Sequence, residues 1–152
     1  MIYKLIIFLI LNFGALAFGG LFTSNGVSSE WYINLSKAPW TPPGWVFGAA
    51  WATIMICFSF YLLNLWSIAE DKRLLILLFS IQWILNVAWN PTFFYYNKVL
   101  TSLFIISLLT ILIAFMLIYY WQDLKLKSLL IAPYLIWLFI ATSLNGYIFF
   151  KN

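Results

Sequence analysis

The chain has 152 residues and a net charge of +4; 65% of its residues are hydrophobic and only 8% are charged. A soluble domain is about half apolar and about a quarter charged, so a soluble fold could not hide this much apolar surface from water. The eight Lys and Arg residues are scattered, with no basic face, which argues against nucleic acid as a partner. Histidine is absent and Cys57 is the only cysteine, so we expect neither a metal site nor a cofactor.

The charged residues leave five long windows without charge, at 5–29, 38–69, 74–97, 99–122 and 128–150. A bilayer core of about 30 Å needs roughly 20 helical residues, and a segment in lipid must satisfy its own backbone hydrogen bonds. The sequence therefore predicts one all-α domain, 1–152, that is an integral membrane bundle of five transmembrane helices. Their expected limits are 3–22, 44–67, 74–94, 99–120 and 127–149.

The first predicted helix also has the features of a signal peptide, because Lys4 precedes an apolar run and Ala15-Leu16-Ala17 imitates a cleavage site. We expect this segment to be retained, since its loss would open the bundle. Five spans place the two termini on opposite sides of the membrane. The side of the N-terminus collects five Lys and Arg residues against three on the other side, which favours a cytoplasmic N-terminus in a bacterial cell membrane.

The long connection at 23–43 is rich in aromatic residues and proline. Its middle, Glu30 to Lys37, has room for a short helix that begins after Ser28 or Ser29. Three prolines stiffen the rest, and Pro42-Pro43 leads directly into the second span. We expect this loop to fold over the end of the bundle as a lid.

The charge-free windows contain amides, hydroxyls and tryptophans but nothing that ionises as an acid or a base at neutral pH. This composition excludes a proton relay and acid–base catalysis. Two helices carry a face of such residues at helical spacing. The faces consist of Gln82, Asn86 and Trp89 on the third helix, and of Trp137, Ala141 and Leu144 on the fifth. Together with Trp51 they predict an apolar pocket with a few amides, the composition of a small-molecule site.

Each of these residues also has a purely structural interpretation. A tryptophan in mid-span is more often core packing than a ligand contact. The amides of Asn86 and Asn145 fit a bond between two helices as well as they fit a bond to a ligand.

Three blocks of the sequence resemble those of the TspO / translocator-protein (peripheral benzodiazepine receptor) family. The first block, WYINLSKAPWTPPGWVFGAAW, runs from Trp31 to Trp51. The second runs from Gln82 to Phe94 and the third from Pro133 to Asn145. There are departures: the proline of the loop is displaced to Pro39, and Asn90 stands where the family commonly has serine. Pro91 follows, and it should kink the third helix or end it early.

The resemblance implies a cavity beneath the first loop and, by analogy, a homodimer. Gly14, Ala17, Gly48 and Ala49 are the small residues that fit a helix interface. The family's cavity positions correspond here to Trp51, Asn86, Trp89, Trp137, Ala141 and Leu144. Trp31, Tyr32 and Pro42 correspond to the loop that closes the cavity.

The resemblance leaves three functions open. The first is a receptor for porphyrins such as protoporphyrin IX and for drug-like aromatics, with a role in tetrapyrrole regulation or stress response. The second is an enzyme that degrades porphyrin with light and oxygen, in which Trp31 and Trp137 would take part. The third is sterol or lipid transport, because Leu144, Tyr147 and Lys151 fit a proposed cholesterol pattern.

Overall fold

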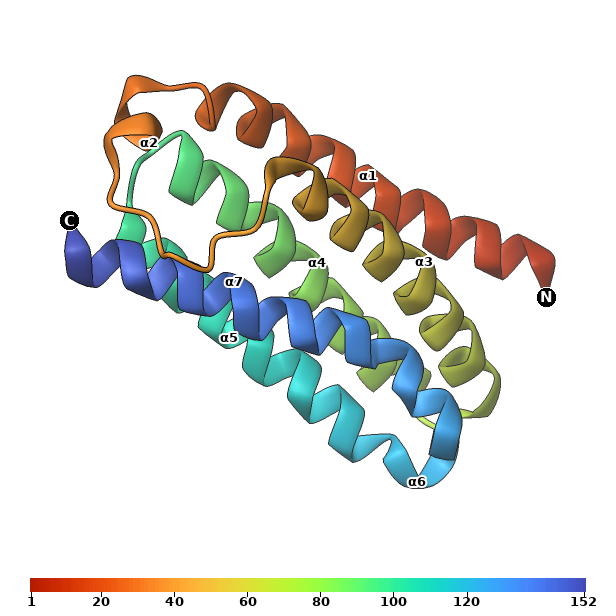
Figure 1. The fold of residues 1–152 in the computed structure, drawn as a ribbon. Helices are drawn as coiled ribbons and strands as arrows, with labels where there is room; N and C mark the ends of the chain where they lie inside the picture. The colour runs from red at the N-terminus through yellow and green to blue at the C-terminus, as the bar shows by residue number, and fades with distance from the viewer.

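The computed structural model describes residues 1–152, and every regular element in it is helical. The long helices are α1 (Ile2–Gly26), α3 (Gly44–Ile68), α4 (Lys72–Phe94), α5 (Val99–Tyr119) and α7 (Ala132–Lys151). The short elements are α2 (Glu30–Asn34), α6 (Trp121–Leu124) and the 3-10 helix η1 (Lys125–Ile131). The two termini lie at opposite ends of the bundle, with α2 near the C-terminus (Figure 1).

The long helices carry large apolar side chains on their outer faces. Phe104, Ile111 and Phe139 have 63%, 65% and 59% of their surface exposed. Such outward apolar faces fit a bilayer, where the surrounding solvent is itself apolar. Five helical segments are long and apolar enough to cross a membrane. The prediction of a multi-pass, all-α membrane protein with five spans is confirmed.

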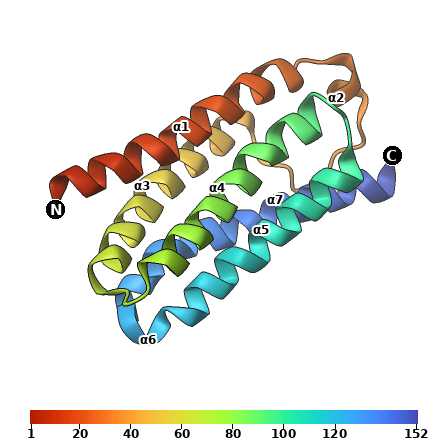
Figure 2. The same ribbon diagram turned by 180° about the vertical axis from the view of Figure 1, so that it is seen from behind.

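The five long helices pack as a ring. α1 packs against α3 and α4, α4 packs against α5, α5 against α7, and α7 against α3 (Figure 2). Polar side chains join helices both around and across this ring: Asn12 Nδ2 on α1 donates to Ser59 Oγ on α3 at 2.8 Å. Gln82 Nε2 on α4 donates to the Tyr134 hydroxyl on α7 at 2.8 Å. Each bond pairs two polar groups that cannot bond to water inside a membrane.

The packed core occupies the half of the bundle that is remote from α2. On α3, buried residues begin at Ile54 and continue to Leu65, whereas residues 44–53 include none. Phe58 anchors this core by stacking on Tyr61, with ring centroids 6.0 Å apart, and by an edge contact with Tyr134 at 5.3 Å. The half of the ring near α2 is therefore left less tightly filled.

Two predicted boundaries differ from the structure. α1 continues to Gly26 instead of ending at residue 22, so the lid loop is confined to residues 27–43. The last long helix begins at Ala132 rather than at 127, because residues 125–131 form η1. Lys125 has a φ of 51°, in the left-handed region, which breaks the chain direction between α6 and η1. Pro133 then lies in the first turn of α7, where its missing N–H costs no hydrogen bond.

Pro91 does not end α4, contrary to one of the two outcomes expected for it. The helix continues to Phe94, and Tyr95 N–H still donates to the Pro91 carbonyl at 3.0 Å. Proline so close to the end of a helix removes a single backbone bond. The Thr92 hydroxyl also donates to the Ala88 carbonyl at 2.7 Å, which adds a bond across the same turn.

Candidate functional site

The lid loop begins with the short helix that its sequence predicts. Ser29 caps α2, because its Oγ accepts from the backbone N–H of Tyr32 at 3.2 Å. The rings of α2 face the end of α4: Trp31 meets Phe93 edge-on at 5.5 Å, and Tyr32 lies 5.5 Å from Phe94. Aromatic contacts thus hold the first part of the lid on α4.

The second part of the lid is fixed to α7. Trp40 Nε1 donates to Ser143 Oγ at 3.1 Å, and its ring meets that of Tyr147 edge-on at 5.4 Å. The backbone N–H of Ser36 donates to the side-chain oxygen of Asn152 at 2.8 Å. The loop therefore spans from α4 to α7 across the end of the ring, as its path in Figure 1 shows.

A cavity of about 670 Å³ lies beneath this lid. Its volume is within the range of about 300–1,000 Å³ that is typical of small-molecule sites. Four long helices and the lid contribute to its walls. Lining residues from α1 are Ala15, Leu16, Gly20, Thr23 and Ser24; those from α3 are Gly44, Phe47, Gly48 and Trp51; those from α4 are Asn86, Trp89, Asn90 and Phe94; those from α7 are Trp137 and Ala141.

Helical periodicity explains why these residues meet. Each wall repeats at intervals of three or four residues, which keeps its side chains on one face of the helix. Glycines widen the space: a Cβ added at Gly44 or Gly48 would meet no atom within 4 Å. A second, smaller cavity of about 50 Å³ shares Trp89 and Ala141 with the first and extends towards Leu144.

The carboxamide of Asn86 is the most informative polar group in the large cavity. The residue is 6% exposed, yet its side chain makes no hydrogen bond to the protein, although it lines the cavity. Buried amides are normally paired, and an unpaired one is costly. The indole Nε1 of Trp89, one turn further along α4, also has no partner. The Asn86 amide is thus free to bond to a ligand in the cavity, whereas the Trp89 Nε1 is itself enclosed by protein atoms.

The neighbouring amide Asn90 is held in place instead. Its Oδ1 accepts from Thr23 Oγ1 at 2.8 Å, which ties α4 to α1. The two helices approach closely here, and glycine at position 19 permits it, since a Cβ at that position would lie 2.5 Å from Asn90 Nδ2. This contact fixes the wall of the cavity on the side of α1.

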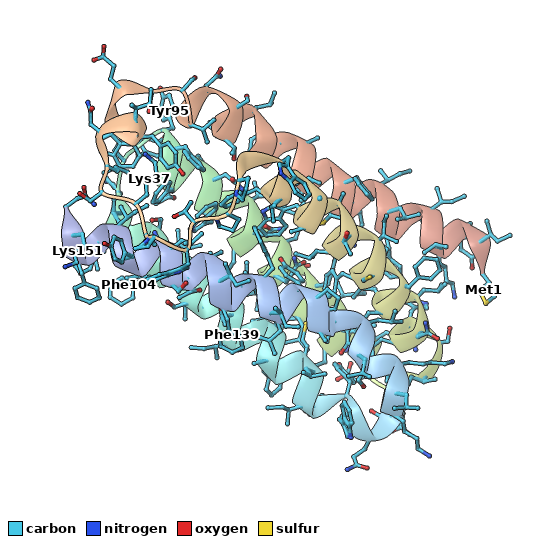
Figure 3. All side chains as sticks on the ribbon, in the orientation of Figure 1. Met1, Lys37, Tyr95, Phe104, Phe139 and Lys151 are labelled. Carbon is cyan, nitrogen blue, oxygen red and sulfur yellow. The ribbon has the colours of Figure 1, made fainter.

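Lys37 is the one charged residue in the lining of either cavity. It lies on the lid, at the end of the bundle opposite Met1 (Figure 3). Its Nζ donates to the Ile33 carbonyl at 3.2 Å and lies 4.6 Å from the centre of the Tyr32 ring. Burial raises the pKa of the Tyr32 hydroxyl, so this ring stays neutral beside the ammonium group.

The structure brings together eight of the nine residues that the sequence analysis assigned to the site. The residues that line one or both cavities are Tyr32, Pro42, Trp51, Asn86, Trp89, Trp137, Ala141 and Leu144. Trp31 is the exception, since it packs against Phe93 and lines neither cavity. The part of all nine residues in ligand binding stays a prediction.

Other residues of interest have structural partners. The side chain of Asn145 bonds to the hydroxyl of Ser102 on α5: its Oδ1 lies 3.1 Å from Ser102 Oγ as an acceptor, and its Nδ2 lies 3.0 Å from the same oxygen as a donor. Trp83 points away from the cavity and donates to the Leu11 carbonyl at 3.0 Å. In the proposed sterol pattern, only Leu144 lines a cavity.

Residues of α1 and of the first turns of α3 also line the cavity, although the sequence did not predict them there. Phe47 and Gly48 share a helical face with Trp51, so their spacing could have identified them. Ala15 and Leu16 carry no such signal, because small apolar residues occur throughout a membrane helix. Lys37 could have been identified from the sequence, because it is the charged residue that precedes the prolines of the lid.

Comparison with known proteins adds an independent result. The sequence profile of the TspO/MBR family matches residues 6–150. The chain is similar to a tryptophan-rich sensory protein of Cereibacter sphaeroides, with 31% identity over 76% of this chain and 73% of the relative. It is 33% identical to the tryptophan-rich protein TspO of Archaeoglobus fulgidus, over 88% of this chain and 87% of the relative. It is 30% identical to the human translocator protein, over 80% and 74%.

Proposed function

The chain belongs to the TspO/MBR family, and from that premise we propose that it is a membrane receptor for flat, apolar aromatic ligands of the porphyrin type. The observation that carries the proposal is the cavity of about 670 Å³ beneath the lid, with an unpartnered Asn86 amide in its wall. The word "sensory" in the name of one relative supports a sensing role, and for a porphyrin receptor that role would be tetrapyrrole regulation or stress response.

The lining suits a planar ring system. Trp51, Trp89 and Trp137 supply three indoles from three different helices. A stacked or edge-on aromatic contact contributes about 0.5–1.5 kcal/mol beyond area burial. An amide such as that of Asn86 both donates and accepts, which matches a macrocycle that contains pyrrole N–H groups and imine nitrogens.

The expected affinity is moderate. The porphyrin ring alone, about 25 heavy atoms at about 0.3 kcal/mol per atom, would bind with a Kd in the low micromolar range. The lining contains no histidine, cysteine or carboxylate. Binding therefore relies on shape, stacking and amide bonds rather than on metal ligation or acid–base chemistry.

The direct experiment is a titration of tryptophan fluorescence with protoporphyrin IX in detergent. The discriminating variant is Ala141→Phe, because Ala141 lines both cavities and a phenyl group there would fill the space. The matched control is Ser80→Phe, which places the same group at an exposed position of α4 that lines neither cavity. Loss of quenching in Ala141→Phe alone supports the proposal; equal quenching in all three proteins refutes it.

A light-dependent degradation of the bound porphyrin is a second candidate. It is favoured by the position of Trp137, which is 6% exposed and lines the cavity where the ring system would lie. Trp31 does not share that position. Illumination of the complex in oxygen distinguishes the two functions, since an enzyme accelerates the loss of the porphyrin spectrum relative to protein-free porphyrin in the same detergent and a receptor does not.

A further inference from the structure

The large cavity is uneven in polarity along the bundle axis. At the lid end its lining includes Thr23, Lys37 and Thr41, whereas Trp51 and Trp137 lie deeper, where the amide of Asn86 is the polar group. Trp51 is about 10 Å along α3 from Gly44, at about 1.5 Å per residue. A ligand that fills the cavity therefore meets a polar mouth at one end and an aromatic floor at the other.

The charge at this mouth is not paired with an acidic side chain. No acidic side chain lines either cavity, and Lys37 makes no salt bridge within the chain. Of the three N–H donors on its ammonium group, one donates to the Ile33 carbonyl. The face of the Tyr32 ring provides a further attraction, but it does not neutralise the charge.

A half-buried cation of this kind favours an anion in the space beside it. The attraction between opposite charges is stronger near a low-dielectric wall than in open water. The indoles of the floor require an apolar body, so the anion must belong to an otherwise apolar molecule. A carboxylate matches the ammonium group in charge and accepts its remaining N–H donors.

We propose that Lys37 is the specificity-determining residue of this site, because its ammonium group pairs with a carboxylate of the flat apolar ligand beneath the lid while the ring system lies against Trp51 and Trp137. This inference rests on the proposed function and names the residue of the same site that recognises the acid group. It also fixes the orientation of the ligand, with the acid group towards the membrane surface at the end of α2. Lys37 is thus a specificity-determining residue: it selects acids over neutral ligands of the same shape.

The test compares protoporphyrin IX with its dimethyl ester, which has the same ring and no charge. Both ligands are titrated against the wild-type protein and against Lys37→Gln, Lys37→Arg and Lys98→Gln in neutral detergent. Lys98 is the matched control, because it is exposed at the same end of the bundle and lines neither cavity. The quantity of interest is the ratio of the affinities for acid and ester, which cancels general effects on lid folding.

We expect the wild-type protein to prefer the acid by about fivefold, the upper range for a partly exposed ion pair. The preference should vanish in Lys37→Gln and persist in Lys37→Arg and Lys98→Gln. The proposal is overturned if acid and ester bind equally well, if Lys37→Gln weakens both ligands by the same factor, or if Lys98→Gln abolishes the preference as well. If neither porphyrin binds the wild-type protein at all, it is the proposed function itself that fails.

Discussion

The substitution Asn86→Leu tests whether the Asn86 amide binds a ligand or bonds two helices together. Asn86 is 6% exposed and its side chain has no partner in the protein. Leucine is close to asparagine in size but needs no hydrogen bond. We expect the variant to gain stability in the absence of ligand and to lose affinity for porphyrin, two effects of opposite sign.

The magnitudes follow from the state of the amide. A net hydrogen bond contributes about 0.5–1.5 kcal/mol, so its loss should weaken porphyrin binding by about 2- to 12-fold. An amide buried without a partner costs about 1–3 kcal/mol in protein mutational data. Water in the empty cavity offsets part of this cost, and we therefore expect a gain of about 1 kcal/mol in the free energy of unfolding.

The assay combines thermal unfolding in detergent with a tryptophan-quenching titration of the same samples. The control is Asn12→Leu, because Asn12 is also buried, but its side chain bonds to Ser59 at 2.8 Å and lies outside the cavity lining. Its loss should lower stability by about 0.6 kcal/mol, the average for such bonds in membrane bundles, and leave affinity unchanged. If Asn86→Leu instead lowers stability and binds porphyrin as tightly as the wild type, Asn86 is a structural residue and the reasoning is wrong.

Three further predictions test other parts of the site. Gly26→Ala should lower both stability and porphyrin affinity, because the new Cβ would lie 2.4 Å from the Phe94 ring that supports the lid. The control Gly14→Ala, whose new Cβ meets no atom within 4 Å, should lower neither quantity. Thermal unfolding measures the stability and tryptophan quenching measures the affinity. Haem and metal-free protoporphyrin should bind with similar affinity, since the site lacks histidine and cysteine, and a spectrum of axially ligated haem with much tighter binding would contradict this. If the protein degrades porphyrin, Trp137→Phe should abolish the light-dependent loss of the porphyrin spectrum; loss at the wild-type rate would exclude Trp137 from the reaction.

The overall fold was predictable because lipid simplifies the problem. Charges mark the ends of the spans, and helices are the simplest way for an isolated apolar segment to satisfy its backbone. Local capping was also readable, as Ser29 shows at the start of α2. The start of α7 at Ala132 could not be predicted, because the apolar residues of η1 have the same hydropathy as those of α7.

The site residues could be predicted where a polar or aromatic side chain occurs within an otherwise aliphatic helix. Asn86 and Trp137 stand out in a membrane helix, and their helical spacing indicates which way they face. The positions of Gly19 and Ala15 depend on how closely α1 and α4 approach, and that distance is a property of the packed bundle. The difference between the paired Asn145 and the unpartnered Asn86 is likewise tertiary, since it depends on Ser102 lying opposite one amide and not the other.

An experimental structure of the protein with protoporphyrin IX bound in a lipid environment tests the central claim most directly. We predict that the macrocycle lies beneath the lid, against the indoles of Trp51 and Trp137 and within hydrogen-bond distance of the Asn86 amide. A porphyrin bound on the lipid-facing surface, with the space under the lid empty or closed, would contradict it.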